Sequence, residues 1–171
     1  LTSWATQIGY TKPQYSVSAI VNLKYNGWSD GYLHTDDADG PLVTDGNHTA
    51  IGFRGWWRPD QTGTVTPSVS FGYDTTEYDG ITDIAGADSS DMWFIGLQWQ
   101  DMLTADDKIG LALAQPTKTD TETVEPFAYE LYYSYKANDS VTITPTIFGG
   151  TDRKGSTEDV FGALVQTTFK F

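Results

Sequence analysis

Strict alternation of apolar and other residues is the feature that most constrains this chain. The segment 127–136 shows it clearly, because its odd positions carry Phe127, Tyr129, Leu131, Tyr133 and Tyr135. Successive side chains of a β-strand point to opposite faces, whereas a helix would scatter these residues around its axis. The segment is therefore expected to be a strand with one apolar and one polar face.

The same period of two recurs along the whole chain of 171 residues. Strands are expected at residues 4–10, 15–25, 49–57, 65–73, 93–99, 109–113, 127–136, 141–147 and 161–171. With their flanking residues, these segments approach the roughly 9 to 11 residues that a tilted strand needs to cross a bilayer. Pro67 and Pro145 each remove a backbone donor, so weakened or bulged pairing is expected at both.

Aromatic residues mark the ends of the apolar faces, as in a barrel that contacts two membrane–water interfaces. The predicted interface residues are Tyr15, Tyr25, Trp93, Trp99, Phe127, Tyr135, Phe161 and Phe171. The opposite faces are rich in Thr, Ser, Gln, Asn and Gly. The sequence thus predicts an all-β fold, a transmembrane antiparallel up-and-down β-barrel, with residues 1–171 forming a single domain.

Short and long links alternate between the expected strands, and most of the acidic residues lie in the long ones. The short links are 12–14, 59–64, 104–107 and 137–139, and the long links are 29–47, 74–91, 116–126 and 149–159. Outer-membrane barrels have short periplasmic turns and long outer loops. An acidic outer mouth is therefore predicted at Asp30, Asp36, Asp37, Asp39, Asp45, Asp79, Asp83 and Asp88.

The net charge of −13, from 23 acidic and 10 basic residues, argues against nucleic acid as a partner, because clustered Lys and Arg provide affinity for phosphate. There is no cysteine, which excludes disulfides and thiolate metal sites. Two histidines and no nucleophile elbow or phosphate loop predict a protein that is not an enzyme and has no cofactor.

The last segment, 161–171, resembles the terminal strand of bacterial outer-membrane proteins, which closes on an aromatic residue such as Phe171. Segments 22–28, 48–54 and 125–133 are similar to the C-terminal half of cyanobacterial porins related to the OprB-type carbohydrate-selective porins. This resemblance covers most of the chain. It implies a passive diffusion channel in the cyanobacterial outer membrane, a homotrimer surrounded by outer-membrane lipids, with small ions or sugars in transit. The surface-layer-homology domain and coiled coil of that family have no counterpart in these residues.

The parity of the strands adds a further expectation. Single-chain bacterial barrels have an even number of strands, so nine strands are expected to be the last part of a barrel of about 16 to 18, in which the interior is an aqueous channel. If the first segment is not a strand, residues 15–171 would instead close an eight-stranded barrel filled by its own side chains.

Alternation places Lys24, Arg54, Glu130, Lys136 and Lys170 toward the interior, where charged side chains determine selectivity. Lys24 and Arg54 lie on neighbouring expected strands, so they form either a basic strip across the constriction or a merely solvated wall. The acidic mouth predicts a weak cation preference.

Two other interpretations remain open. The acidic loop 34–40 has enough carboxylates to hold a calcium ion, but its spacing is not that of an EF-hand, and a solvated acidic loop is the favoured interpretation. A soluble carbohydrate-binding β-sandwich with acidic calcium-holding loops would show the same alternation, with the apolar faces as its core.

Overall fold

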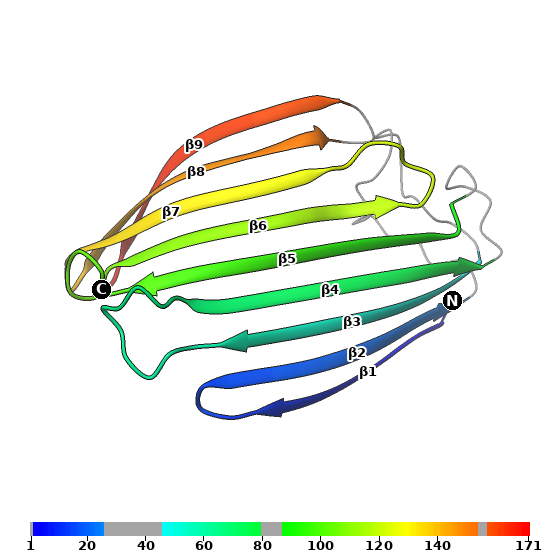
Figure 1. The fold of residues 1–171 in the computed structure, drawn as a ribbon, viewed down its shortest axis with the longest axis horizontal. Helices are drawn as coiled ribbons and strands as arrows, with labels where there is room; N and C mark the ends of the chain where they lie inside the picture. The colour runs from blue at the N-terminus through cyan, green and yellow to red at the C-terminus, as the bar shows by residue number, and fades with distance from the viewer. Residues whose placement is uncertain (1, 26–45, 80–86, 154–156) are drawn as a thin grey trace.

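The computed structural model describes residues 2–25, 46–79, 87–153 and 157–171. In this part of the chain, nine strands follow one another: β1 (Thr2–Thr11), β2 (Tyr15–Tyr25), β3 (Asn47–Trp57), β4 (Ser68–Asp79), β5 (Ser89–Gln100), β6 (Lys108–Thr119), β7 (Phe127–Asn138), β8 (Val141–Arg153) and β9 (Glu158–Phe169). They form one sheet in the order β1 to β9, and each strand is antiparallel to the next (Figure 1). The predicted all-β, up-and-down antiparallel architecture is confirmed.

The two ends of the sheet are named here by their links. The turn end holds links 12–14, 58–67, 101–107 and 139–140, and the loop end holds links 26–46, 80–88, 120–126 and 154–157. The strands near the loop end are longer than predicted, since β4 continues to Asp79 and β8 to Arg153. The difference in length between the two sets of links is therefore smaller than the sequence suggested.

The predicted start of the fourth strand at Val65 is wrong, because β4 begins at Ser68. Val65 lies in the preceding link with 84% of its surface exposed. Pro67 separates the two, and a proline without an N–H and with a fixed φ is tolerated at a strand boundary rather than inside a ladder. The link therefore runs up to Pro67.

Pro145 weakens the pairing within the sheet, as predicted. The register between β7 and β8 runs to Tyr132↔Thr146 and resumes at Tyr135↔Ile143, so the two positions between them have no backbone partners. A hydroxyl pair crosses this gap, because Thr144 Oγ1 donates to Ser134 Oγ at 3.1 Å. On its other side, Pro145 still lies opposite Val165 of β9.

The register aligns apolar residues from strand to strand on one face of the sheet. Phe53 lies opposite Tyr73, and Tyr73 lies opposite Trp93. Leu111 lies opposite Leu131 on the next pair of strands. Directly opposite residues of antiparallel strands share a face, so these positions form one continuous apolar face.

This apolar face has no second layer over it. Among the described residues, the only buried apolar side chains are Tyr78 and Ala87, whereas Ile8 and Val165 are 75% and 68% exposed. A soluble domain buries such residues, and a large exposed apolar surface marks contact with a partner or a membrane. The two-sheet sandwich alternative is therefore wrong for the described residues, which form a single sheet.

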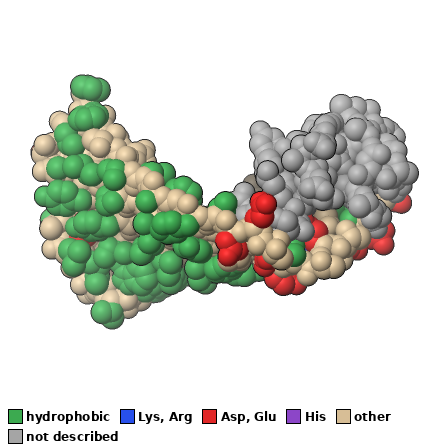
Figure 2. Space-filling view, turned by 90° about the horizontal axis from the view of Figure 1, so that it is seen from above, with side chains coloured by type: hydrophobic (Ala, Val, Ile, Leu, Met, Phe, Trp, Pro, Cys, Tyr) green, Lys and Arg blue, Asp and Glu red, His purple; other side chains and the backbone are tan. Residues whose placement is uncertain are grey.

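Figure 2 shows hydrophobic side chains covering the sheet toward the turn end and acidic side chains gathered nearer the loop end. No helix in the described part of the chain is long and apolar enough to span a membrane.

Strands β1 and β9 lie at the two edges of the curved sheet (Figure 1). Strand β1 pairs with β2 at ten positions from Thr2↔Tyr25 to Thr11↔Ser16. The first segment is thus a strand, and β2 does not close onto β9. The eight-stranded barrel alternative is therefore wrong.

Substitutions by arginine on the two faces of the sheet are expected to change the free energy of unfolding by very different amounts. Replacing Leu131 on the apolar face by arginine should destabilise the folded protein in lipid by about 2 to 4 kcal/mol, the cost of a cation near the bilayer centre. Replacing Ala128 by arginine, on the opposite face of the same strand, should cost much less. Unfolding free energies in phospholipid vesicles measure this contrast, and equal losses for the two variants would contradict the assignment of the faces.

Candidate pore wall

The polar wall is defined here as the face of the sheet opposite the apolar face. Lys24 lies on it opposite His48, Arg54 opposite Gly72, and Glu130 opposite Ala112. Lys136 also lies on the polar wall, opposite Thr142. Lys170 follows the end of β9, and its backbone N–H donates to the carbonyl of Ser140 at 2.9 Å.

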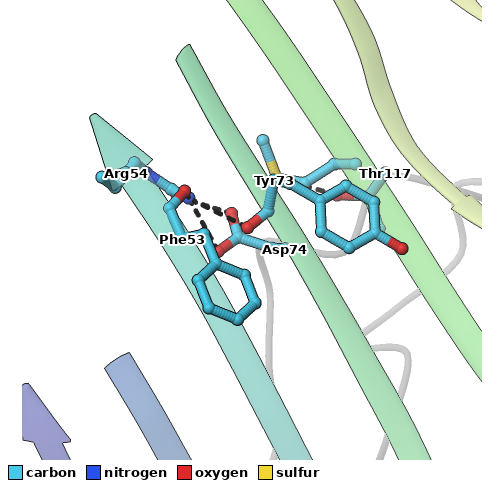
Figure 3. Close-up of polar contacts among 6 residues, drawn as sticks. Phe53, Arg54, Tyr73, Asp74 and Thr117 are labelled. Atoms are coloured by element: carbon cyan, nitrogen blue, oxygen red, sulfur yellow. Dashed lines mark hydrogen bonds and ion pairs between the residues drawn. The ribbon is translucent and has the colours of Figure 1, made fainter. Parts of the chain in front are cut away.

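Arg54 of β3 and Asp74 of β4 form a two-pronged ion pair on the polar wall (Figure 3). Arg54 Nη1 donates to Asp74 Oδ1 at 2.9 Å, and Nη2 donates to Oδ2. Nη1 also reaches the carbonyl oxygen of Phe53 at 2.9 Å. A guanidinium held at both prongs is fixed in direction as well as neutralised.

Two glycines make room for this pair. A Cβ added to Gly52 would lie 2.2 Å from Asp74 Oδ1, and one added to Gly72 would lie 2.9 Å from Arg54 Cδ. The added Cβ of Gly72 would also lie 2.3 Å from Cε1 of Phe94, whose ring centroid is 5.6 Å from Arg54 Cζ. The charged side chains therefore lie along the wall instead of projecting from it.

Of the two alternatives for Lys24 and Arg54, the basic strip is not formed. Lys24 lies opposite His48, six positions along β3 from Arg54. At about 3.3 Å per residue, this separates the two by roughly 20 Å. The partner of Arg54 is Asp74, which the sequence analysis placed in a long link. The alternation within β4 continues past Tyr73, and extending it by one position would have placed Asp74 on the same face as Arg54.

A small pocket adjoins the ion pair on the side of the loop end. Its lining includes Asn22, Asp74, Thr76, Met92 and Thr117. Thr117 Oγ1 donates to Met92 Sδ at 3.8 Å, near a bulge in the pairing of β5 with β6 (Figure 3). Asn22 Oδ1 is buried there with no hydrogen-bond partner among the described residues. The pocket thus presents oxygen acceptors to whatever fills it.

Aromatic rings of the polar wall lie across glycines of a neighbouring strand. Tyr132 lies opposite Gly110, whose added Cβ would be 2.1 Å from Tyr132 Cε1. Phe148 lies opposite Gly162 in the same way, with 2.5 Å to its Cζ. These pairs, with Phe94 over Gly72, keep large rings flat against the sheet. These glycines and aromatic residues are visible in the sequence, but which glycine lies opposite which ring depends on the register between strands, which the sequence does not show.

At the turn end, the carboxylate of Asp107 organises the link 101–107. It is fully buried and accepts the backbone N–H groups of Met102 at 2.9 Å, Leu103 at 3.0 Å and Thr104 at 2.8 Å. The hydroxyl of Tyr133 donates to it as well, at 3.2 Å. Desolvation raises the pKa of Asp107, but the hydrogen bonds more than offset it and hold the pKa below its ordinary value.

The same link is tied to β7 by charge. Lys136 Nζ lies 2.9 Å from Asp106 Oδ2 and 3.2 Å from Asp139 Oδ1. The hydrogen bond from Lys136 and then its positive charge lower the pKa of Asp106. Asp101 and Asp106 adopt positive φ angles of 59° and 64°, and aspartate is among the residues that tolerate this conformation.

The predicted interface aromatics lie on the apolar face by register, and Phe171 follows the end of β9. Tyr15, Trp99 and Tyr135 lie near the turn end, and Tyr25, Phe127 and Phe161 near the loop end, with Trp93 inside β5. This placement agrees with two bands, and contact with membrane interfaces stays a prediction.

Of the predicted acidic mouth, Asp79 and Asp88 lie at the loop end. The backbone N–H of Asp88 donates to the Asp120 carboxylate at 3.1 Å. Asp30, Asp36, Asp37, Asp39, Asp45 and Asp83 lie outside the described residues, as does the acidic loop 34–40 considered for calcium.

No protein-family model matches the sequence, and no curated protein matches it. Among solved structures, the chain is similar to OmpT, an outer-membrane protein of Vibrio cholerae that was folded in vitro and solved in its trimer form. The TM-score is 0.52 at 13% identity, over 94% of this chain. The nine-stranded sheet therefore has the fold of part of that outer-membrane protein. The chain spans about half of that protein's length, 52%. At this identity the similarity establishes the fold alone.

Glycines of the polar wall that lie beneath large side chains are not expected to tolerate a larger residue. Gly72→Ala should destabilise the protein by about 1 to 3 kcal/mol, because the new methyl group displaces the Phe94 ring and the Arg54 side chain. Gly9→Ala is the matched control, since its added Cβ would be 3.2 Å from Ser18 Cβ. Urea unfolding in detergent micelles measures both variants, and a Gly72→Ala variant as stable as the control would contradict the close approach.

The turn at 101–107 is expected to depend on the Asp107 charge. Asp107→Asn should increase hydrogen exchange at the amides of Leu103 and Thr104, because one acceptor oxygen becomes a donor facing two donors. Asp60→Asn, in the neighbouring link, should leave these amides protected. Because the folded pKa of Asp107 is below its ordinary value of 3.8, its stabilisation is complete above that pH and is lost as pH falls through the folded value. If the amides of Leu103 and Thr104 stayed equally protected at a pH where Asp107 is fully protonated, this role of the Asp107 charge would be contradicted.

Proposed function

We propose that this chain forms part of a water-filled channel in the bacterial outer membrane, through which small hydrophilic solutes and ions diffuse passively. One observation supports this most strongly: a single antiparallel sheet presents exposed apolar side chains on one face and charged and hydroxyl side chains on the other. Such a sheet has no stable arrangement in water alone, but it fits between hydrocarbon and an aqueous interior.

Closure of the sheet is part of this proposal. Strands β1 and β9 each have one edge without a partner strand among the described residues. In hydrocarbon, unpaired backbone groups cost several kcal/mol each, so strands cross a bilayer only in closed barrels. The chain spans 52% of the outer-membrane protein it matches, which supports further strands and a barrel of about 16 to 18, a size that leaves a channel.

The ionic preference follows from the charges on the wall. Asp74 neutralises Arg54, and Asp106 and Asp139 neutralise Lys136, so these two cations attract few anions. The chain as a whole carries a net charge of −13. A weak cation preference that fades with salt follows from these charges. We include sugars and small ions among the solutes, on the resemblance to OprB-type porins.

The assembly and source proposed here rest on two similarities. The matched structure is a trimer form, which supports a homotrimer embedded in outer-membrane lipids. Segments 22–28, 48–54 and 125–133 support a cyanobacterial porin. Diffusion through such a channel needs no cofactor and no catalytic residue.

Recording from the full-length protein in planar bilayers tests the proposal. The unsubstituted protein should form ohmic channels with a small preference for potassium over chloride. Arg54→Gln leaves Asp74 uncompensated, and should raise the cation-to-anion permeability ratio by about twofold at 0.1 M salt. Asp74→Asn should lower the ratio, and the double variant should restore it.

The reversal potential across a salt gradient gives each ratio. Absence of conductance would refute the channel. Identical reversal potentials in all four proteins would show that Arg54 and Asp74 do not face the conducting path.

A further inference from the structure

We propose that the pocket beside the Arg54–Asp74 ion pair is a binding site for small primary ammonium compounds. Oxygens of Asn22 and Asp74 accept the N–H donors of the ammonium group. Ile20 and Met92 contact the alkyl part. This inference rests on the proposed channel function and names one class of solute that binds to the channel wall. It is carried by a cavity whose described lining combines hydrogen-bond acceptors with apolar side chains.

The floor of the pocket is formed by Ala50 and Gly52 of β3, which are the smallest residues of its described lining. Asn22 of β2 lies opposite Ala50. A Cβ added to Gly52 would lie 2.2 Å from Asp74 Oδ1 and 2.9 Å from Ile20 Cγ2. The Asp74 carboxylate thus reaches over Gly52 toward β2. Oxygens from β2 and β4 therefore approach the same small floor from its two sides.

Asn22 contributes an acceptor that no described residue uses. Its Oδ1 is buried and has no hydrogen-bond partner, while the side chain as a whole is half-buried. A buried acceptor without a partner costs free energy, so the pocket favours an occupant that donates a hydrogen bond. Thr76 lies on the other side of Ala50 and lines the same pocket, and its hydroxyl can accept a further bond.

Asp74 supplies the negative charge of the site. Arg54 pairs with it, but neither Arg54 nor Lys24 is among the described residues that line the pocket. A cation in the pocket therefore lies nearer to the carboxylate than to the guanidinium. Each Asp74 oxygen accepts one bond from Arg54 and keeps a second lone pair for another donor. Asp91 belongs by register to the apolar face, where Gln115 Nε2 donates to its carboxylate at 2.8 Å.

Two apolar side chains complete the pocket. Ile20 of β2 lies opposite Gly52, and Met92 of β5 lies opposite Asp74. Thr117 Oγ1 donates to Met92 Sδ, which restrains the flexible thioether. The volume of about 310 Å³ is far larger than a bare ion needs, since one water takes about 30 Å³ in the liquid. Apolar side chains in a space of this size favour a cation with an alkyl part.

The N–H donors separate the proposed ligand from other cations. A primary ammonium group has three donors, which match Asn22 Oδ1, the Asp74 carboxylate and the Thr76 hydroxyl. Tetramethylammonium has the same charge but no N–H donor. Potassium has neither a donor nor an apolar part, and n-butanol has both but no charge. These four compounds therefore test the charge, the donors and the alkyl part separately.

The test measures binding of n-butylammonium to the full-length protein in detergent micelles by ligand-observed NMR, and partial block of single-channel current by the same compound. n-Butylammonium should bind about tenfold more tightly than tetramethylammonium, potassium or n-butanol, because only it satisfies the charge, the acceptors and the apolar side chains together. Asn22→Leu should weaken its binding about three- to tenfold, the value of one hydrogen bond. Asp74→Asn leaves the Arg54 charge uncompensated and should abolish measurable binding.

Asn22→Asp keeps the size of the side chain and adds a charge, so it should tighten n-butylammonium binding about two- to fivefold. A gain of affinity is not explained by misfolding. Asn138→Asp is the matched control, since it adds the same charge at the end of β7, where Oδ1 accepts the backbone N–H of Ser140 at 2.9 Å. This control should bind n-butylammonium as the unsubstituted protein does.

Equal binding of n-butylammonium and tetramethylammonium would overturn the proposal in favour of general attraction to acidic residues. Equal binding of potassium would show that the alkyl part contributes nothing, and would overturn the solute class. The same n-butylammonium constant in the unsubstituted protein, Asn22→Leu and Asn22→Asp, or no binding by any of them, would overturn the site. A conducting channel with any of these results leaves the proposed function intact. Because the NMR measurement needs no open channel, absence of conductance refutes that function separately.

Discussion

Backbone hydrogen bonding between adjacent strands is the interaction on which the rest of this structure depends. The described chain has almost no buried apolar core, so packing of side chains does not hold the nine strands together. The ladders from β1 to β9 do so, and they also fix which residues share a face. Once the register of a strand is set, the face on which its apolar residues lie is set too, because a slip of one position would turn every one of them to the polar side.

The charged and aromatic side chains of the polar wall lie against the sheet and take up little of the space in front of it. Gly52 and Gly72 have no Cβ, which leaves room for Asp74 and Arg54 to lie close to the sheet. The rings of Tyr132 and Phe148 lie across glycines of neighbouring strands in the same way. One neutralised pair, Arg54 with Asp74, and the flat rings thus occupy little of the space in front of the wall. Arg58 and Glu130 make no ion pair with any residue that the structure describes.

The sequence predicted the faces well and the contacts poorly, for a physical reason. Alternation depends only on the strand itself, so the bounds of β2 were obtained without error. The pairing of Arg54 with Asp74 depends on the register of β3 with β4, which alternation does not contain. Similarly, the several acidic residues of link 101–107 look alike in sequence, and only the fold selects Asp107 as the one that is buried. Pro145 was predicted correctly because a missing N–H acts locally.

The gap opposite Pro145 has a mechanical consequence for the ladder between β7 and β8. Two successive positions between β7 and β8 are joined by the hydroxyls of Thr144 and Ser134 in place of the backbone. Hydroxyl contacts reform easily after they part, whereas a continuous ladder resists stretching as a unit. Bending of the sheet at this gap therefore breaks no backbone hydrogen bond between β7 and β8, so the gap is a compliant point in that ladder.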